Sequence, residues 1–350
     1  MNKKKDYSAV KFEVSEELGE WMNCLYLKRD DGHQWDHNFI HHTQSDGVGG
    51  ITKILEEEGH KVKAQPVTRP MPAMGLLKKF RLLKSFINLT NTVNQLWKSE
   101  RLDIKGVPET FCLNLLTSSQ TEALQKRVEE KGVSLNTWLF FTLDQVCCEV
   151  LLQSGSERKW ISPINIRTEK IKKYGNHSAS IIVNFLKKDF EKHSPQLLHS
   201  NIKKYLKANL HWGSFLYSNM ARLIGKRGTL KVAKRIKEVG TGVFSNLGIW
   251  PDENITLDTK KRSYNRRAVL APVTQVLPIA ATAWQWQDRL SLSLQLHPSL
   301  NLSNDTNVIV MKKWSSLLGI EGDLDIEHHH WSTFSECPQE KIVLRKTTTH

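Results

Sequence analysis

Several features are missing from this sequence, and each absence narrows the class of protein. It contains no apolar run long enough to span a membrane as a helix. No apolar segment follows the N-terminal lysines, as a secretion signal would require. We also find no internal repeat and no low-complexity tract. These absences favour a cytoplasmic globular protein.

Cysteine is scarce and its spacing forms no framework. The five cysteines include no C-x-x-C pair, and Cys147 and Cys148 are adjacent within an apolar segment. We therefore expect buried thiols in a reducing compartment rather than disulfides or a structural zinc site. The histidines His328, His329 and His330 lack Cys or carboxylate partners at metal-ligand spacing, so we predict no metal site and place them in a solvated tail over 326–350.

Acidic residues are too few to balance the basic ones. Asp and Glu number 36 against 50 Lys and Arg, which gives a net charge of +14. Such a charge suits a phosphate-bearing cofactor, an acidic carrier protein, an anionic lipid surface or nucleic acid, although a solvated basic face would also explain it. The basic region 202–237 lacks interleaved aromatic residues, so we expect no nucleic acid there. Phosphates of coenzyme A or an acidic carrier protein are the simpler partners.

The residues that are present predict a globular mixed α/β chain. Hydrophobic residues make up 39% of the sequence and 11 Trp are included, which is enough for a sizeable core. Periodicity predicts strands over 21–28, 34–42, 108–116, 160–167, 178–187, 241–250, 274–285 and 289–297. It predicts helices over 51–58, 76–87, 119–132, 137–152, 195–238 and 304–318. We expect a capping box at Ser119 and Glu122, and Asn136 as the cap of the next helix.

The segment 76–87 has two interpretations. Its apolar residues recur at helical spacing with basic residues between them. A basic amphipathic helix of this kind can bind a membrane surface. A surface helix that covers the core explains the same pattern.

The most informative stretch runs from His41 to Gly47 and reads His-His-Thr-Gln-Ser-Asp-Gly. Histidine takes up a proton near neutral pH, as a general base for acyl transfer must. Asp46, four residues after His42, can turn back and hold the loop. The following glycines permit backbone conformations that other residues avoid. A histidine satisfied within a turn is the alternative for His42.

This heptad resembles the His-His-x-x-x-Asp-Gly motif of the chloramphenicol-acetyltransferase-like superfamily, which includes condensation domains of nonribosomal peptide synthetases, wax ester synthases and alcohol acetyltransferases. Three further stretches follow in the expected order. They are the helical segment 118–152, the sequence Pro-Ile-Asn-Ile-Arg at 163–167 with Gly-Asn at 175–176, and Ser-Asn-Leu-Gly at 245–248. Together the resemblance spans about residues 20–320.

The resemblance implies roles for individual residues. His42 would be the general base that activates the acceptor, and His41 would be structural. Asp46 would form a salt bridge with Arg167, and Gly47 would leave room at the tunnel centre. Two further residues, Ser245 and Asn246, would line the substrate tunnel or polarise the thioester carbonyl, although both residues also suit a turn.

The resemblance also implies a fold and substrates. The fold would be two chloramphenicol-acetyltransferase-like subdomains in a V, here 1–155 and 156–325. An acyl thioester, on coenzyme A or on the phosphopantetheine of a carrier protein, would donate to a small alcohol or amine, with no permanently bound cofactor. Only 40 residues precede His41, so the first subdomain would be shortened at its N-terminus, completed by a partner or part of a longer chain. A non-catalytic binding or scaffold protein is therefore the rival interpretation.

Overall fold

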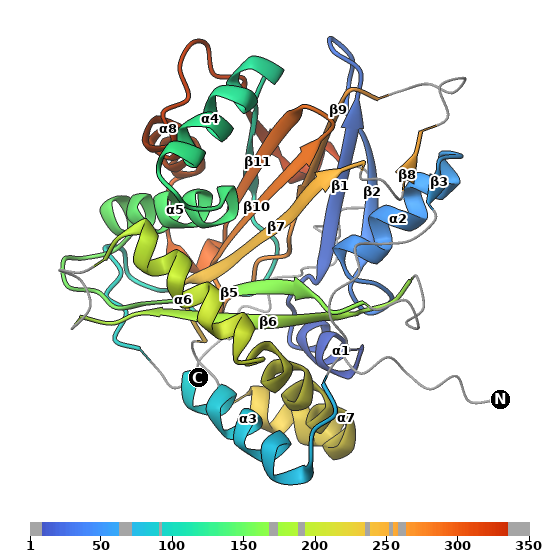
Figure 1. Cartoon of the computed structure of the whole chain (residues 1–350), viewed down its shortest axis with the longest axis vertical. Helices are drawn as coiled ribbons and strands as arrows, with labels where there is room; N and C mark the ends of the chain where they lie inside the picture. Colours follow the sequence, from blue (N-terminus) through green and yellow to red (C-terminus); the bar gives the residue numbers. More distant parts are fainter. Residues whose placement is uncertain are drawn as a thin grey trace, which may run out of the picture.

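The main element of the fold is a seven-stranded mixed sheet. The computed structural model describes residues 9–62, 72–90, 93–167, 174–187, 193–234, 239–251, 255–257 and 264–334. In this sheet the strand order is β12-β4-β11-β10-β7-β5-β6 (Figure 1). The strands are β4 (Thr110–Leu115), β5 (Arg158–Asn165), β6 (Ser178–Phe185), β7 (Gly242–Trp250), β10 (Ile279–Trp286), β11 (Arg289–Leu296) and β12 (Ile326–His330).

A smaller sheet carries the histidine motif. Its order is β2-β1-β9, formed by β1 (Asn23–Arg29), β2 (Asp36–His41) and β9 (Arg266–Leu270). The strands β1 and β2 form an antiparallel hairpin, and β9 from the far end of the chain pairs with the other edge of β1. The short strands β3 (Lys61–Val62) and β8 (Ile255–Thr256) form a separate pair.

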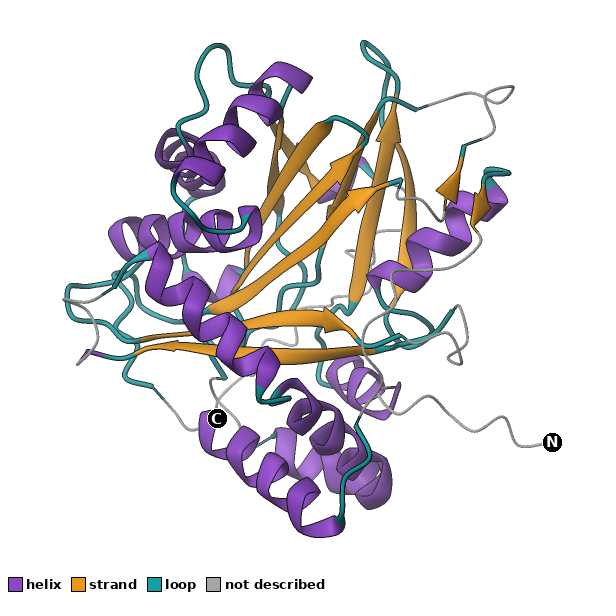
Figure 2. Cartoon of the chain, viewed as in Figure 1, coloured by secondary structure: helices purple, strands orange, loops and turns teal. Residues whose placement is uncertain are grey.

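Helices lie in two groups around the sheets (Figure 2). The first comprises α4 (Ser118–Glu130), α5 (Leu135–Leu151) and α8 (Thr306–Leu318), with α6 (Pro195–Lys207) beside α5. The second comprises α1 (Ala9–Glu17), α3 (Leu76–Leu89) and α7 (His211–Ala233), which lie at the lower end in Figure 1. The helix α2 (Gly47–Glu57) follows β2 directly and packs against it.

The largest core lies between the seven-stranded sheet and α5 and α8. Phe140 of α5 stacks on Phe244 of β7 with ring centroids 5.3 Å apart. Trp314 of α8 is fully buried and donates its indole N–H to the carbonyl of Leu139. Because truncating a buried aromatic residue to alanine typically costs about 3–5 kcal/mol, these contacts fix the sheet that positions the site.

Two predicted helix caps are wrong by two residues. Thr117, rather than Ser119, forms the capping box of α4 with Gln120, and Ser134, rather than Asn136, caps α5. Thr117 and Ser134 are the last residues with extended backbone before their helices, so their hydroxyls are the first that can accept from the free helical N–H groups.

The C-terminal tail predicted over 326–350 is wrong for residues 326–334. Strand β12 pairs antiparallel with β4, so the three histidines lie on a sheet edge. Trp331 and Phe334, which follow it, are 1% and 6% exposed because they pack against Phe111. The residues 335–350, including Cys337, lie outside the described part of the chain.

The long basic segment predicted over 195–238 is two helices rather than one. Asn209, with φ of 60°, separates α6 from α7, and α7 is itself kinked at Gly225.

The strand β4 lies before the subdomain boundary predicted at residue 155, yet it is hydrogen-bonded to β11 and β12 within the seven-stranded sheet.

Candidate active site

The strand β2 delivers the two histidines to the site. Asn23 lies opposite His41 in the hairpin register, and the backbone N–H of His42 donates to the carbonyl of Met22 at 3.2 Å. Successive residues of a strand point to opposite faces. His41 is accordingly exposed, whereas the ring of His42 turns into the molecule.

Two side chains contact the ring of His42, and a third contacts its backbone. The Cys24 Sγ atom of β1 lies 3.2 Å from Nε2. The Phe12 ring of α1 lies 4.9 Å from the imidazole, tilted by 31°. Asn176 donates its side-chain amide to the backbone carbonyl of His42 at 2.5 Å. These contacts hold the imidazole between the small sheet and α1.

Burial sets the charge state of His42. Desolvation lowers its pKa below the usual 6.5, although the carboxylate of Asp46 and the side chain of Asn176 both favour the protonated form. The imidazole is therefore neutral at pH 7, and a neutral imidazole is the form that accepts a proton.

Cys24 stays protonated beside this imidazole. Burial, with a further contribution from the carboxylate of Asp46, raises the pKa of the Cys24 thiol to about 12. A thiol is a weak hydrogen-bond donor, and a neutral imidazole offers one acceptor nitrogen. The geometry thus allows the Cys24 S–H group to donate to His42 Nε2.

Asp46 and Arg167 form a buried ion pair with two contacts. The guanidinium of Arg167 donates to the two carboxylate oxygens of Asp46 at 2.6 and 3.0 Å. Asp46 is 4% exposed and Arg167 is 2% exposed. Arg167 follows the end of β5 and also donates to the carbonyl of Gly175 at 2.7 Å. The pair therefore joins the histidine loop to the large sheet.

Asp46 also caps the N-terminus of α2. Its Oδ1 atom accepts the backbone N–H of Gly49 at 2.8 Å as the helix N-cap, and its Oδ2 accepts that of His177 at 2.8 Å. Both carboxylate oxygens are thus occupied by donors from within the protein. This arrangement suits a loop-holding residue rather than a proton carrier.

The glycines of the motif differ in what they accommodate. A Cβ atom at Gly49 would meet Ser45 Oγ, would lie 2.7 Å from the Arg167 guanidinium and 3.1 Å from the carbonyl of Gly175. A Cβ at Gly47 would lie 3.8 Å from Leu247, an ordinary contact. Gly49 is therefore the glycine that lets Arg167 reach Asp46, a role that the sequence analysis did not assign.

Ser245 and Asn246 lie in β7, near the histidine loop. The parallel pairing of β5 with β7 includes Trp160 and Ile161 only, after which the two strands separate. Arg167 follows the carboxyl end of β5, and Leu247 of β7 lies beside Gly47. In sheets with parallel strands, ligands bind at such carboxyl ends, where neighbouring strands diverge.

The side chain of Asn246 is occupied locally. Its Oδ1 atom accepts the N–H of Gly248 at 2.8 Å, and Gly248 has φ of 80°. The register of β7 against β10 shifts at the same place, which indicates a bulge. Within the described residues, no hydrogen bond joins Ser245 or Asn246 to the side chain of His42.

Cys24 and Phe12 are site residues that sequence reasoning missed. A signal for Cys24 existed in the turn-forming residues Asp30, Asp31 and Gly32 between the strands predicted over 21–28 and 34–42, because a hairpin register of this kind places Cys24 opposite Ile40. Residues 40 and 42 share a face of the strand, so Cys24 then lies near His42. No signal in the sequence pairs Phe12 with the motif, since α1 is separate from the hairpin.

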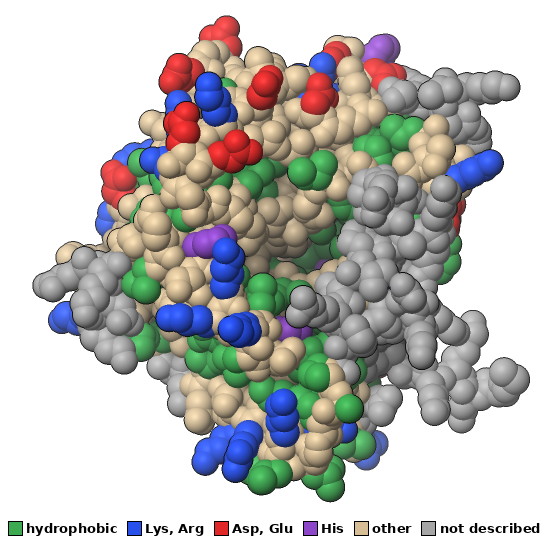
Figure 3. Space-filling view, viewed as in Figure 1, with side chains coloured by type: hydrophobic (Ala, Val, Ile, Leu, Met, Phe, Trp, Pro, Cys, Tyr) green, Lys and Arg blue, Asp and Glu red, His purple; other side chains and the backbone are tan. Residues whose placement is uncertain are grey.

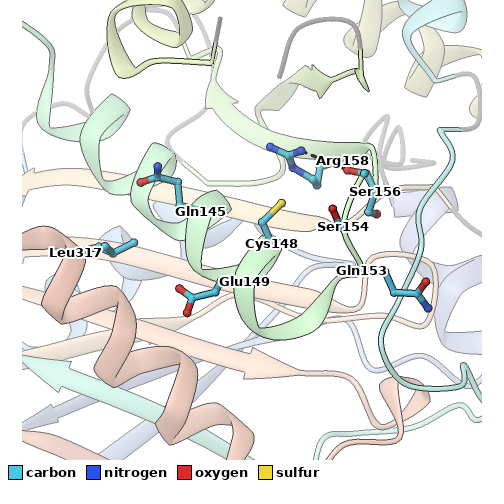
Figure 4. Close-up of a pocket in the computed structure, with 9 residues that line it drawn as sticks. Gln145, Cys148, Glu149, Gln153, Ser154, Ser156, Arg158 and Leu317 are labelled. Atoms are coloured by element: carbon cyan, nitrogen blue, oxygen red, sulfur yellow. Dashed lines mark hydrogen bonds between the residues drawn. The ribbon is translucent and has the colours of Figure 1, made fainter. Parts of the chain in front are cut away.

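A cavity of about 500 Å³ lies elsewhere, between the end of α5 and α8 (Figure 4). Its lining includes Cys148, Glu149, Arg158 and Leu317. Arg158 is already paired with the buried carboxylate of Asp144 at 2.8 Å. None of the candidate site residues lines this cavity.

The described residues include neither a metal-binding cluster nor a membrane-spanning helix. Among them, no group of three or more His, Cys, Asp or Glu side chains is arranged to hold a metal ion. No helix in the same part of the chain combines the length and apolarity needed to cross a membrane.

Comparisons with known proteins identify the fold. The sequence matches no model of a protein family and no curated protein. Among solved structures, trichothecene 15-O-acetyltransferase from Fusarium sporotrichioides is similar, with a TM-score of 0.55 and 13% identity over 80% of this chain and 65% of that one. The EpoB cyclization-docking bidomain from Sorangium cellulosum is similar with a TM-score of 0.54 and 12% identity, over 82% of this chain and 60% of that one.

These similarities confirm the predicted fold class. The chain has a mixed α/β fold that is similar to the folds of the trichothecene acetyltransferase and of the EpoB bidomain. It spans less than two thirds of the length of either of these two structures. At such identities the likeness defines the fold alone, and the chemistry depends on the residues of this chain.

Proposed function

We propose that this protein is an acyltransferase that moves an acyl group from a thioester to a hydroxyl or amine acceptor, with His42 as the general base. The observation that carries the proposal is the neutral, half-buried imidazole of His42, in a loop anchored by the ion pair of Asp46 and Arg167. The fold supports it in general terms, since one similar structure is an acetyltransferase.

The proposed reaction needs one base and no bound cofactor. The acceptor O–H or N–H gives its proton to His42 as its oxygen or nitrogen attacks the thioester carbonyl carbon. The C–S bond then breaks, and His42 returns the proton to the departing sulfur. The donor is acyl-coenzyme A or an acyl group on the phosphopantetheine of a carrier protein, and the chain's net charge of +14 suits either anionic donor.

In this proposal the other residues position the base. Asp46 and Arg167 fix the loop, and His41, exposed on the opposite face of β2, does no chemistry. Ser245 and Asn246 are proposed to line the acyl path, and Gly47 leaves space between the loop and Leu247. The acceptor must approach Nε2 from the side now occupied by Cys24.

A separate observation favours a second candidate function. Phe12 covers the His42 ring and Cys24 contacts its Nε2 atom, so the base is enclosed by the protein itself. A non-catalytic binding or scaffold protein with this fold would tolerate such an arrangement. It predicts no turnover of any acyl thioester.

Product analysis separates the two candidates. The protein is incubated with a mixture of acyl-coenzyme A esters and a panel of alcohols and amines, and products are identified by mass spectrometry. An ester or amide that requires the protein and disappears with His42→Ala supports the acyltransferase. Product formed equally by His42→Ala overturns the role of His42, and absence of any product favours the scaffold.

A further inference from the structure

The helices α3 and α7 present apolar side chains to the outside. On α3 the residues Leu76, Phe80 and Ile87 are exposed, Leu76 by 85% and Phe80 by 65%. Together with Leu83 they follow spacings of four, three and four residues, which place them along one face of a helix. The opposite face, with Leu82 and Phe86, is buried.

α7 extends this apolar surface. Its residues Tyr217, Met220, Leu223 and Ile224 are exposed, Leu223 by 79%. The two helices are in direct contact, since the Phe86 and Tyr217 rings lie 5.6 Å apart. A Cβ at Gly213 of α7 would lie 2.6 Å from the carbonyl oxygen of Leu82, so the backbones approach closely. A core-covering helix pair would bury these side chains, and here they remain outside.

Charge of one sign surrounds the apolar side chains. Lys and Arg number four in α3 and four in α7, and neither helix contains Asp or Glu. Within the described residues, no ion pair joins Lys78, Lys79, Arg81 or Lys84 to a carboxylate. On α7, Lys226 pairs with Glu17 of α1 at 2.7 Å. The two helices together thus carry a net charge of +8, compared with +14 for the whole chain.

On the face shown in Figure 3, acidic and basic side chains are unevenly distributed. Figure 3 shows basic and hydrophobic side chains gathered over the lower end, where α3 and α7 lie, and acidic side chains gathered over the upper end near α4. We define the α3–α7 surface as the exposed apolar residues of both helices together with Lys78, Lys79, Arg81 and Lys84. Contiguous exposed apolar surface marks an interaction site.

We propose that the α3–α7 surface binds the surface of an anionic lipid bilayer. Apolar side chains along one helix face enter the boundary between headgroups and acyl chains, while flanking lysines remain among the anionic headgroups. A second copy of this chain is a poor occupant, because two such basic surfaces repel each other. A bilayer also needs no shape complementarity. This suits the apolar residues of α3, which lie on an exposed helix face rather than in a pocket.

Co-sedimentation of the whole chain with vesicles tests the proposal. Vesicles of phosphatidylcholine alone are compared with vesicles that also contain phosphatidylglycerol, at low and high salt. The wild type should sediment with the anionic vesicles, bind the neutral vesicles at least about tenfold less, and lose binding as salt is raised.

Paired variants distinguish the two parts of the surface. Leu76→Ser with Phe80→Ser removes apolar contacts, and Lys78→Gln with Lys84→Gln removes charge. Each pair should weaken binding about tenfold or more. The matched control is Ile309→Ser with Lys312→Gln on α8, where both residues are exposed and one is apolar and one basic. This control should bind as the wild type does.

Three results would overturn the proposal. They are sedimentation with neither kind of vesicle, equal binding to both, and a control pair that weakens binding as much as the α3–α7 variants do. Binding of an acidic soluble protein to this surface, without vesicle binding, would also overturn it. None of these readouts depends on acyl transfer, so the lipid proposal fails or holds separately from the proposed activity.

Discussion

The thiol of Cys24 lies against the imidazole nitrogen of His42 that takes the substrate proton in the proposed reaction: Sγ and Nε2 are 3.2 Å apart. Since the thiol is buried and protonated, it can donate to the lone pair that the proposed base uses. An acceptor must therefore displace this contact before it reacts. Through this contact, the packing of the β1–β2 hairpin affects the chemistry proposed for the histidine loop.

The thiol of Cys24 should react slowly with alkylating reagents in the folded chain. Alkylating reagents attack the thiolate, and a pKa of about 12 leaves almost none at neutral pH. We expect iodoacetamide to label Cys148, which is partly exposed with a pKa of about 11, before Cys24. Peptide mapping after timed labelling checks the order, and denatured protein serves as the control. Rapid native labelling of Cys24 would contradict the burial described here.

The pH dependence of turnover should follow His42. Because burial lowers its pKa below 6.5, the base form predominates at neutral pH and is lost only as the pH falls through that lowered value. The kcat/KM profile should thus be flat near pH 7 and decline on the acid side with an apparent pKa below 6.5. A decline that begins above pH 7 would show that another group limits the reaction.

Removal of Arg167 should unfold the site rather than only slow the reaction. Arg167→Ala leaves the buried Asp46 carboxylate without its cation, and breaking a buried pair in this way typically costs about 3–5 kcal/mol. Urea denaturation measures the free energy of unfolding. The double variant Asp46→Asn with Arg167→Met should lose less than Arg167→Ala, because no buried charge is stranded. A loss below about 1 kcal/mol for Arg167→Ala would indicate an exposed, weak pair.

Two glycines of the same helical turn offer a matched comparison. A Cβ in Gly49→Ala would meet Ser45, the Arg167 guanidinium and a backbone carbonyl, so we expect a loss of about 1–3 kcal/mol in the free energy of unfolding. A Cβ in Gly47→Ala would meet only Leu247 at an ordinary distance, so its stability should stay within about 1 kcal/mol of wild type. Equal losses in the two variants would show that helix geometry, not the approach of Arg167, requires the glycine.

The sequence predicts the elements better than it predicts the contacts between them. The hairpin around Gly32, the buried helix α5 and the paired strands β10 and β11 all follow from local periodicity and turn residues. The caps at Thr117 and Ser134 were misplaced because several hydroxyl-bearing residues compete there, and backbone geometry decides among them. The sequence does not predict strand β12, because its three histidines have no apolar alternation.

The same difference between predicted elements and unpredicted contacts applies to the site. The approach of Arg167 to Asp46 connects residues 121 positions apart, and only the resemblance to known motifs, not composition or spacing, suggested it. Phe12 has no motif, so its contact with His42 emerges only when α1 packs against the hairpin, whereas the approach of Cys24 follows from the hairpin register. Local sequence patterns do not predict long-range packing of this kind.

The most direct test of the central claim is single-turnover acyl transfer by His42→Ala and His41→Ala, compared with wild type on one identified donor and acceptor. Loss of a general base typically costs about 10²–10⁴ in rate. We predict a loss of that size for His42→Ala, with His41→Ala within a few-fold of wild type and both variants folded by circular dichroism. A His42→Ala protein that transfers acyl groups at the wild-type rate would contradict the account.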